Sequence, residues 1–248
     1  MKASKLEQKS LCYDHRQPSN EQPVSITSRR LRTGLLAAAC TSLLATALPA
    51  SAALVTSRAG LAGTDFIDWG QLGGSFTTVV DPVTVTTNLG LTAMVSMPGG
   101  ANMERRDQNN GWGGNFAGGD KLLWTLNSSG PITIDFATGL SAIGAQIQAN
   151  FFGAFDGLIT AYDSSNNILE SYSVQGNSNS NGDNSAIFIG IQRSAGDIDH
   201  VEFAIANGNG PDFAINQVDL QQVPEPGSLA LAGLAFVGTV LTRRRKTA

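Results

Sequence analysis

The segment Pro98–Asp120 holds the side chains best suited to contact a ligand. Sugar rings bind proteins by packing their C–H groups on an aromatic face and by hydrogen bonding to carboxylate, guanidinium and amide groups. This glycine-rich segment supplies all of these groups, and a loop of its length inside a compact domain is usually functional or disordered. We predict a glycan-binding loop here, carried by Glu104, Arg105, Arg106, Asp107, Trp112 and Phe116. In the alternative, the two aromatic rings fold back to plug one end of the domain, and the charged residues form solvated pairs.

Catalytic chemistry has little support in the sequence. Beyond residue 52 the chain has one histidine, His200, and no cysteine. A Ser-His-Asp site would need His200, yet no G-x-S-x-G turn is present, and the His/Cys spacing that zinc requires is also missing from the sequence. We therefore predict a protein that is not an enzyme, with no catalytic residue and no metal ligand. A pair of carboxylates for glycoside hydrolysis stays open as the alternative.

Calcium is the one cofactor that the sequence leaves open. Residues 177–184 place Asn, Ser and Asp oxygens on alternate positions with Gly182 at the turn, like the first half of a calcium loop. The closing Glu is replaced by apolar residues at Ile187–Ile189. We therefore expect a hairpin turn at this position rather than a metal site.

The elements that must position these residues are strands. In Ile143–Ala149, apolar side chains alternate with small or polar ones, which is the pattern of a half-buried strand. Further strands are predicted at Phe66–Trp69, Phe76–Val80, Val83–Thr87, Leu91–Met97, Leu122–Leu126, Ile132–Phe136, Leu158–Tyr162, Ile168–Val174, Ala186–Ile191, Val201–Ile205 and Phe213–Leu220.

The turns between these strands favour an all-β fold. Asp163–Asn167, whose residues tolerate turn dihedrals, lies between two predicted strands and indicates a hairpin. The chain has 28 glycines, and they weaken any helical interpretation of the body. We predict a single jelly-roll-like β-sandwich.

The charge of the chain is distributed unevenly. Residues 53–222 hold five basic side chains against 16 acidic ones, a net charge of −11, whereas the whole chain has a net charge of −4. Such an acidic body repels phosphate backbones, which argues against nucleic acid as a partner. Both cysteines, Cys12 and Cys40, lie outside the body, so the sequence excludes an internal disulfide framework there.

Residues 1–52 have the features of a leader with a secretory signal peptide. A basic cluster ends at Arg32, the apolar run Gly34–Leu48 follows, and small residues at Ala50 and Ala52 precede the predicted cleavage point. Signal peptidase is therefore an expected partner, with cleavage after Ala52. No function is assigned to the polar stretch 1–27.

Residues 223–248 have a second targeting pattern. Pro224, Glu225 and Pro226 precede an apolar stretch, Gly227–Thr242, and a basic tail of Arg243, Arg244, Arg245 and Lys246. The apolar stretch predicts a single transmembrane helix of about 24 Å, against a hydrocarbon core of about 30 Å. The basic tail would halt transfer and stay on the cytoplasmic side.

This C-terminal arrangement resembles the PEP-CTERM sorting signal of Gram-negative bacteria that make exopolysaccharide. The resemblance implies that an exosortase cuts near the Pro-Glu-Pro motif and transfers the body to the cell surface. Parts of the body also resemble a recurring extracellular domain of such proteins, at Asp68–Gly73, Gly111–Phe116 and Phe152–Phe155. That second resemblance supports the sandwich and implies no activity.

Together these observations predict three parts, namely a leader and signal peptide (1–52), an extracytoplasmic β-sandwich (53–222) and a sorting signal (223–248). The protein is expected to be held briefly in the inner membrane and then sorted to the cell surface or extracellular matrix. There it would serve as a non-enzymatic structural or carbohydrate-binding component associated with exopolysaccharide. The alternatives are a secreted glycan-active hydrolase and a purely structural surface protein with no glycan ligand.

Overall fold

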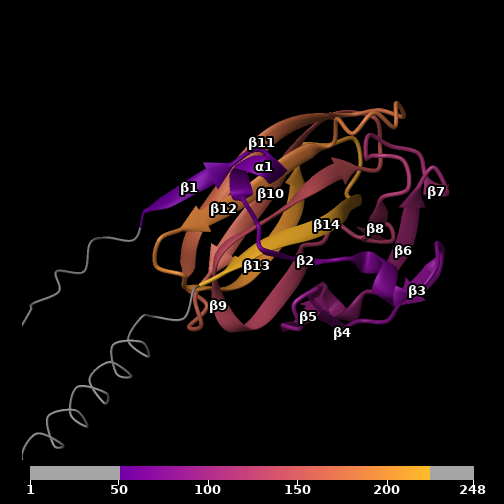
Figure 1. Ribbon diagram of the computed structural model, residues 1–248. Helices are drawn as coiled ribbons and strands as arrows, with labels where there is room; N and C mark the ends of the chain where they lie inside the picture. The colour runs from indigo at the N-terminus through magenta and orange to yellow at the C-terminus, as the bar shows by residue number, and fades with distance from the viewer. Residues whose placement is uncertain (1–50, 224–248) are drawn as a thin grey trace, which may run out of the picture. The chain divides into compact units, whose positions relative to one another are not determined.

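The structure, a computed structural model, describes residues 51–223, which form the predicted body of the protein (Figure 1). Among these residues no helix combines the length and apolar character needed to cross a membrane. The predicted C-terminal helix lies outside the described residues. So do signal-peptide residue Ala50, the Pro224–Pro226 motif and the basic tail Arg243–Lys246.

Strands dominate the described residues, with one short α-helix and two 3₁₀ turns. The strands are β1 (Ala52–Val55), β2 (Asp65–Ile67), β3 (Thr77–Val79), β4 (Val83–Thr86), β5 (Thr92–Ser96), β6 (Met103–Gln108), β7 (Gly111–Trp112), β8 (Lys121–Trp124), β9 (Ile132–Ala149), β10 (Gly153–Tyr162), β11 (Ile168–Ser178), β12 (Ile187–Arg193), β13 (Ile198–Ala206) and β14 (Phe213–Gln222). The helical pieces are α1 (Arg58–Leu61), η1 (Trp69–Leu72) and η2 (Pro98–Gly100).

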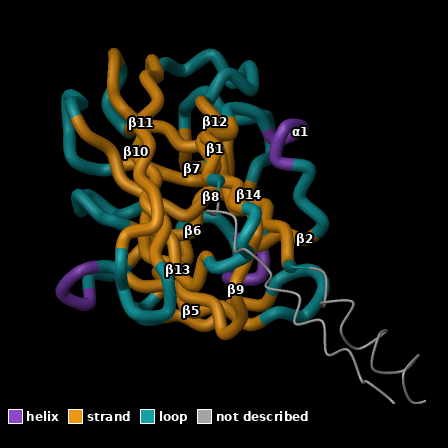
Figure 2. The backbone as a smooth tube through the Cα atoms, turned by 90° about the vertical axis from the view of Figure 1, so that its left-hand side faces the viewer, coloured by secondary structure: helices purple, strands orange, loops and turns teal. Residues whose placement is uncertain are grey.

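The long strand β9 belongs to two sheets in succession. Its first half pairs with β13 and β5, giving a first sheet in the order β11-β10-β13-β9-β5-β4. Its second half pairs with β12 and β14, and the second sheet continues from β14 through β8 and β6 to β3, with β1 on the far side of β12. In Figure 2, β10 and β11 lie on one side of the molecule and β14 and β2 on the other.

Glycine permits the crossing between the two sheets. A Cβ atom at Gly139 would lie 2.5 Å from the carbonyl oxygen of Gly196, which is closer than any side chain tolerates. Only glycine therefore lets β9 pass so near the loop between β12 and β13.

The main core fills the space between the two sheets. From β9 it takes Ile134 before the crossing and Ile143 and Ile147 after it, and these side chains pack with Phe203 and Phe213. All five are completely buried. The all-β sandwich prediction is confirmed.

The predicted hairpin is also confirmed, since β10 and β11 pair antiparallel around residues 163–167. The Asp163 carboxylate accepts hydrogen bonds from the backbone N–H groups of Ser165 and Asn167, both at 2.9 Å. Asn166 has a φ of 61°, which asparagine tolerates better than most residues.

Several boundaries differ from the predicted ones. The predicted strands Ile132–Phe136 and Ile143–Ala149 are parts of the single strand β9, because the intervening residues keep an extended backbone. The prediction that Pro98–Asp120 is one long loop is wrong, because β6 runs through it and pairs with β3 and β8. The strand was not predicted because its charged residues suggested an exposed loop. Side chains such as Arg105 are instead buried in ion pairs.

Both ends of the described domain contact the same loop. The N–H of Ser51 donates to the Ser194 hydroxyl at 3.2 Å, and the N–H of Ser194 donates to the Ser51 carbonyl at 3.3 Å. The Val223 side chain packs against Gly196 of the same loop. The chain thus enters and leaves the sandwich at one end.

Candidate binding site on the outer face of the second sheet

The second half of β9 is buried on both faces, unlike an ordinary sandwich strand. Ile143, Ala145 and Ile147 face the main core, so the alternating positions face outward. Two of those outward positions are glutamines, Gln146 and Gln148, and both are buried. Buried amides need fixed partners, so this face must be covered by a polar network.

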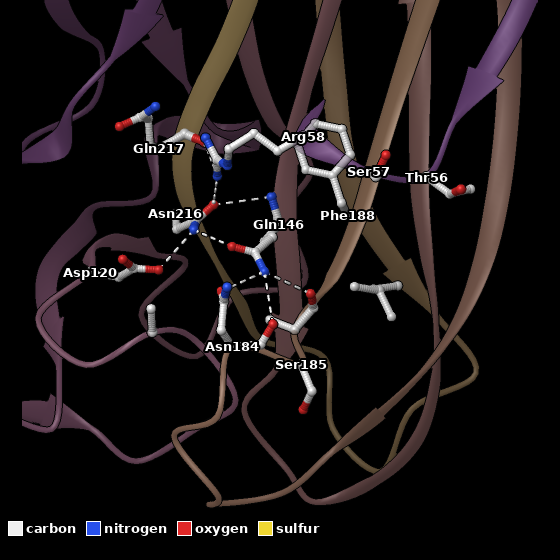
Figure 3. A pocket seen from close by; sticks show the side chains of 13 residues that line it. Thr56, Ser57, Arg58, Asp120, Gln146, Asn184, Ser185, Phe188, Asn216 and Gln217 are labelled. Atoms are coloured by element: carbon white, nitrogen blue, oxygen red, sulfur yellow. Dashed lines mark hydrogen bonds between the residues drawn. The ribbon is translucent and has the colours of Figure 1, made fainter. Parts of the chain in front are cut away.

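A bulge in β14 supplies the first part of that network. The pairing of β14 with β9 shifts between Ile215 and Val218, which leaves Asn216 and Gln217 opposite Gln146. The Asn216 Oδ1 accepts from the backbone N–H of Gln146 at 3.1 Å, in place of a ladder hydrogen bond. Its Nδ2 donates to Gln146 Oε1 at 2.7 Å and to Asp120 Oδ2 at 2.9 Å (Figure 3). Bulges of this kind often re-aim side chains beside functional sites.

Gln146 also fixes the chain segment that enters β12. Its Nε2 donates to Asn184 Oδ1 at 3.0 Å and to the Ala186 carbonyl at 2.9 Å. The side chain of Gln146 therefore joins β9, β14 and the β11–β12 loop in one arrangement, as the dashed lines of Figure 3 show.

Arg58 extends this network beside Asn216. It begins α1, which Ser57 caps by accepting a hydrogen bond from the Gly60 N–H at 3.1 Å. Its Nη1 bonds the Asp219 carboxylate, and its Nη2 donates to Asn216 Oδ1 at 3.1 Å and to the Gln217 carbonyl at 3.3 Å. Burial raises the pKa of Asp219, although its hydrogen bond from Gln217 and its contact with Arg58 act in the opposite direction.

These groups surround a pocket of about 590 Å³. We call it the outer-face pocket, and it is lined by Thr56, Ser57, Arg58, Ala117, Asp120, Gln146, Asn184, Ser185, Ala186, Ile187, Phe188, Asn216 and Gln217. Its volume is within the usual range of small-ligand sites. Most of its polar groups are neutral amides and hydroxyls, and Asp120 is its one carboxylate. Such a lining can hydrogen-bond a ligand rich in hydroxyl groups.

A second network lies deeper, around Gln148. Its Oε1 accepts from the Asn115 N–H at 2.7 Å and from Trp112 Nε1 at 3.3 Å. Its Nε2 donates to Asn115 Oδ1 at 2.9 Å and to the Ser178 hydroxyl at 2.8 Å. Gln148 thus holds two covering loops to the sheet.

The structure does not present the predicted glycan-binding loop as a surface. Trp112 is 6% exposed and Phe116 is completely buried, and they pack with Leu122 and Trp124 on the outer face of the second sheet. The prediction that these two rings form an exposed platform is wrong, because both rings cover the outward side chains of β8. Both rings fold back onto the protein as the alternative expected, but they cover an outer face of the sheet instead of plugging one end of the domain.

The charged residues of that segment are paired within it. Arg105 is 1% exposed and forms an ion pair with Asp107, and Glu104 forms an ion pair with Arg106. The Arg106 guanidinium also lies 4.3 Å from the centre of the Phe76 ring. These contacts stabilise the β3–β6 edge and leave no open site among the four charged residues.

Residues 177–184, which resemble the first half of a calcium loop, comprise the end of β11 and part of the loop between β11 and β12. Its oxygens already accept internal hydrogen bonds, with Asp183 accepting from Ser185 and Asn179 accepting from the Asn181 N–H at 2.8 Å. Across residues 51–223 no group of three or more His, Cys, Asp or Glu side chains is arranged to hold a metal ion.

His200 lies on β13 in the first sheet, away from the outer-face pocket. Its ring stacks on Tyr162 with 4.3 Å between the ring centres, and its Nδ1 is 3.9 Å from an Asp135 oxygen. Tyr162 donates to Glu202 at 2.7 Å, and burial together with this carboxylate raises the pKa of Tyr162 to about 12. No serine hydroxyl of the described chain hydrogen-bonds His200, so the cluster is not arranged as a nucleophilic triad.

The sequence patterns did not link the residues of the outer-face pocket to one another, although Asp120 and Asn184 lie in segments that were predicted to contact other ligands. One signal was present, because Gln146 and Gln148 take the outward positions of a strand whose other outward positions are small. A second was the break of alternation at Asn216-Gln217 within a predicted strand. Neither signal could identify Arg58, Asp120 or Asn184 as the partners, since these come from distant parts of the chain.

The protein is thus an all-β sandwich with a polar pocket on one outer face. Comparison with known proteins shows in addition how the chain is targeted. Residues 222–246 match the PEP-CTERM protein-sorting motif, which confirms the C-terminal resemblance. The chain therefore carries a signal of exported proteins that an exosortase processes at the membrane. The match begins at Gln222, the last residue of β14.

Two solved structures are similar in outline. One is a DUF4465 family protein from Bacteroides caccae, with a TM-score of 0.37 and 10% identity, covering 69% of this chain and 100% of that one. The other is CsCBM6-3 from Clostridium stercorarium in complex with cellobiose, with a TM-score of 0.30 and 12% identity, covering 61% of this chain and 98% of that one. A search of curated proteins found no match.

Proposed function

We propose that this exported protein is a non-enzymatic, carbohydrate-binding component of the cell surface or extracellular matrix, associated there with exopolysaccharide. The outer-face pocket, rather than the Glu104–Phe116 segment, would be its binding site. Signal peptidase would release the N-terminus near Ala52 and an exosortase would process the C-terminus. Residues 53–222 would form the working domain.

The observation that carries this proposal is that three residues of the pocket lining each have a polar atom without a partner in the protein. Asp120 Oδ1, Asn184 Nδ2 and Gln217 Oε1 have no hydrogen-bond partner within residues 51–223, whereas their other polar atoms are held by the network. Acceptors and donors are therefore presented in fixed positions. Preorganised polar groups lose little entropy when they bind a ligand, which favours recognition of sugar hydroxyls.

The position of the pocket relative to the chain ends is compatible with this role. Gln222, where the sorting motif match begins, pairs with Leu140 of β9. Gln146 lies six residues further along the same strand, which corresponds to about 20 Å at about 3.3 Å per residue. The site is thus separated from the segment that leads to the sorting signal.

The test is equilibrium binding of the purified full-length chain to a glycan panel that includes exopolysaccharide from the producing cells. Asp120→Ala and Asn184→Gly each remove one free group together with the neighbouring oxygen that the network holds, and the glycine keeps the positive φ of 63° at position 184. We expect each to weaken binding about tenfold, or about 1.4 kcal/mol. Asp199→Ala and Asn102→Gly, which lie outside the pocket lining, are the matched controls and should bind as the parent does.

The two alternatives predict different results in the same assay. A glycan-active hydrolase would release reducing ends from the bound polysaccharide, which the proposed function does not allow. A purely structural protein would bind none of the panel, and that outcome would refute the carbohydrate-binding role.

A further inference from the structure

Every basic side chain in the described domain is already paired with a carboxylate. The ion pairs are Arg58–Asp219, Arg105–Asp107, Arg106–Glu104, Lys121–Asp107 and Arg193–Asp197. Residues 51–223 contain no further Lys or Arg. Within these residues there is therefore no unpaired cation to receive an anionic ligand, and most of the 16 carboxylates have no cationic partner.

The same holds inside the outer-face pocket, where Arg58 is the only cation of the lining. Recognition of a carboxylate or sulfate by arginine usually needs two parallel N–H donors that point at the ligand. One Arg58 terminal nitrogen bonds Asp219, and the other donates to both Asn216 and Gln217. Both terminal nitrogens of Arg58 are thus already engaged within the protein, although the side chain is 36% exposed, so they do not form a free pair of parallel donors.

One carboxylate, that of Asp120, belongs to the pocket lining. Asp120 lines the pocket and uses one oxygen to accept from Asn216, and its other oxygen has no hydrogen-bond partner within residues 51–223. A hydroxyl can donate to this oxygen, whereas a uronate, sulfate or phosphate would face a like charge at close range. Neighbouring lining groups such as Asn184, Ser185 and Gln217 are neutral.

From this arrangement we infer that the outer-face pocket selects neutral, hydroxyl-rich glycans and rejects glycans that carry carboxylate, sulfate or phosphate groups. The inference rests on the proposed function and specifies its ligand class. The net charge of −11 on the body adds long-range repulsion of polyanionic chains, and this part of the discrimination should weaken as salt screens it.

The test uses matched polymer pairs that differ only in charge. The purified full-length chain is measured by affinity electrophoresis against hydroxyethylcellulose and carboxymethylcellulose, dextran and dextran sulfate, and neutral and oxidised galactomannan. We expect at least one neutral polymer to bind at least tenfold tighter than its anionic partner at about 20 mM salt. At about 0.5 M salt the ratio should fall but stay above one, because contacts inside the pocket are screened less than the outer surface.

Two variants test whether the preference for neutral polymers originates in the outer-face pocket. Asp120→Asn keeps the shape and removes the free carboxylate, so the preference for the neutral partner should fall at least threefold. Asp219→Asn releases the Arg58 guanidinium and should reduce the preference in the same direction. Asp199→Asn removes one carboxylate on β13, outside the pocket lining, and should leave the ratio unchanged within about twofold.

The possible outcomes separate the two claims. Binding to an anionic polymer that equals or exceeds binding to its neutral partner would overturn this inference and leave the carbohydrate-binding role intact. A ratio that responds equally to Asp120→Asn and Asp199→Asn would also overturn it, because selectivity would then come from overall charge. Failure to bind any polymer would refute the proposed function and this inference with it. If Asp219→Asn unfolds, Asp120→Asn decides the question alone.

Discussion

Both halves of β9 alternate core-facing and outward side chains, with the phase changing between Leu140 and Ile143, but the two halves meet different surroundings. Before the crossing at Gly139, the outward residues Thr133 and Asp135 are partly exposed. After it, the outward residues Gln146 and Gln148 are covered by α1, by the β7–β8 segment and by the β11–β12 loop. One strand therefore presents an open surface to one side of the protein and a closed polar layer to the other.

The difference between the two outward faces of β9 shows how a β-sandwich can form a binding site without a change in its main core. On the first sheet, an outward polar side chain can be solvated and needs no particular neighbour. On the second sheet, each outward amide must be satisfied by protein atoms, so Asn216, Asn115 and Asn184 are held in place. A pocket that opens onto such a layer is lined by groups whose positions are already fixed.

The largest effect should come from an aromatic ring of the covering layer. Phe116→Ala removes a completely buried ring from the cluster with Trp112 and Leu122, and should lower the free energy of unfolding by about 3–5 kcal/mol. Phe152→Ala removes a ring that is 53% exposed and should change it by less than about 1 kcal/mol. Urea denaturation measures both, and equal losses would contradict the description of a second, outer core.

The next effect should come from the buried amide of the deeper network. Gln148→Leu keeps the side-chain volume but leaves the Asn115 N–H and the Trp112 indole N–H without their acceptor. At about 1–3 kcal/mol for each buried unsatisfied group, we expect a loss of about 3 kcal/mol. The matched change Thr133→Val, on the first half of β9, should stay within about 0.5 kcal/mol. A small loss for Gln148→Leu would mean that the covering loops do not depend on it.

A smaller effect should come from the ion pair that borders the chain ends. Hydrogen bonding to Arg193 lowers the pKa of Asp197, so its contribution to stability is present at neutral pH and is lost as pH falls through the folded-state pKa. Asp197→Asn should therefore lower the unfolding free energy by about 1 kcal/mol at pH 7. The difference between variant and parent should vanish at strongly acidic pH, and a constant difference across the titration would exclude this pair as its cause.

The substitution Asp219→Asn should have the smallest effect on the free energy of unfolding. Its pH dependence should be opposite to that of Asp197→Asn. Burial raises the pKa of Asp219, so the folded state favours the protonated form, and the stabilisation present at low pH is lost as pH rises through the folded-state pKa. The difference in unfolding free energy between the parent and Asp219→Asn should therefore decline as pH rises through that range. The corresponding difference between the parent and Asp197→Asn should increase as pH rises. Urea denaturation at a series of pH values measures both differences in unfolding free energy. If the two differences changed in the same direction with pH, the opposite roles of Asp219 and Asp197 would be contradicted.

Periodicity and turn chemistry were sufficient to predict the sandwich and its hairpin, because Ile143, Ile147 and Asp163 behave as their local patterns require. The patterns failed where burial depended on distant partners. Arg105 looked like a loop residue, although pairing with Asp107 lets it lie inside a strand. Trp112 looked like a binding residue, although Trp124 and Leu122 provide an apolar surface that buries it.

The candidate site was harder to predict than the fold for a related reason. Gln146 is one outward residue of a regular strand, and it becomes part of a pocket only because Asn216 leaves the ladder opposite it. Arg58, Asp120 and Asn184 then come together from three separate segments. The spacing of residues in the sequence does not show which distant side chains lie together. Only the three-dimensional structure therefore identifies the residues that line the pocket.

Hydrogen–deuterium exchange can show directly whether a glycan binds in the outer-face pocket. The full-length chain would be compared with and without the neutral polymer that binds most tightly in the panel. A glycan in the pocket should slow exchange in residues 56–58, 117–121 and 184–188, with little change in β10 and β11. Protection confined to β10 and β11, or to the β3–β6 edge around Phe76, would contradict it.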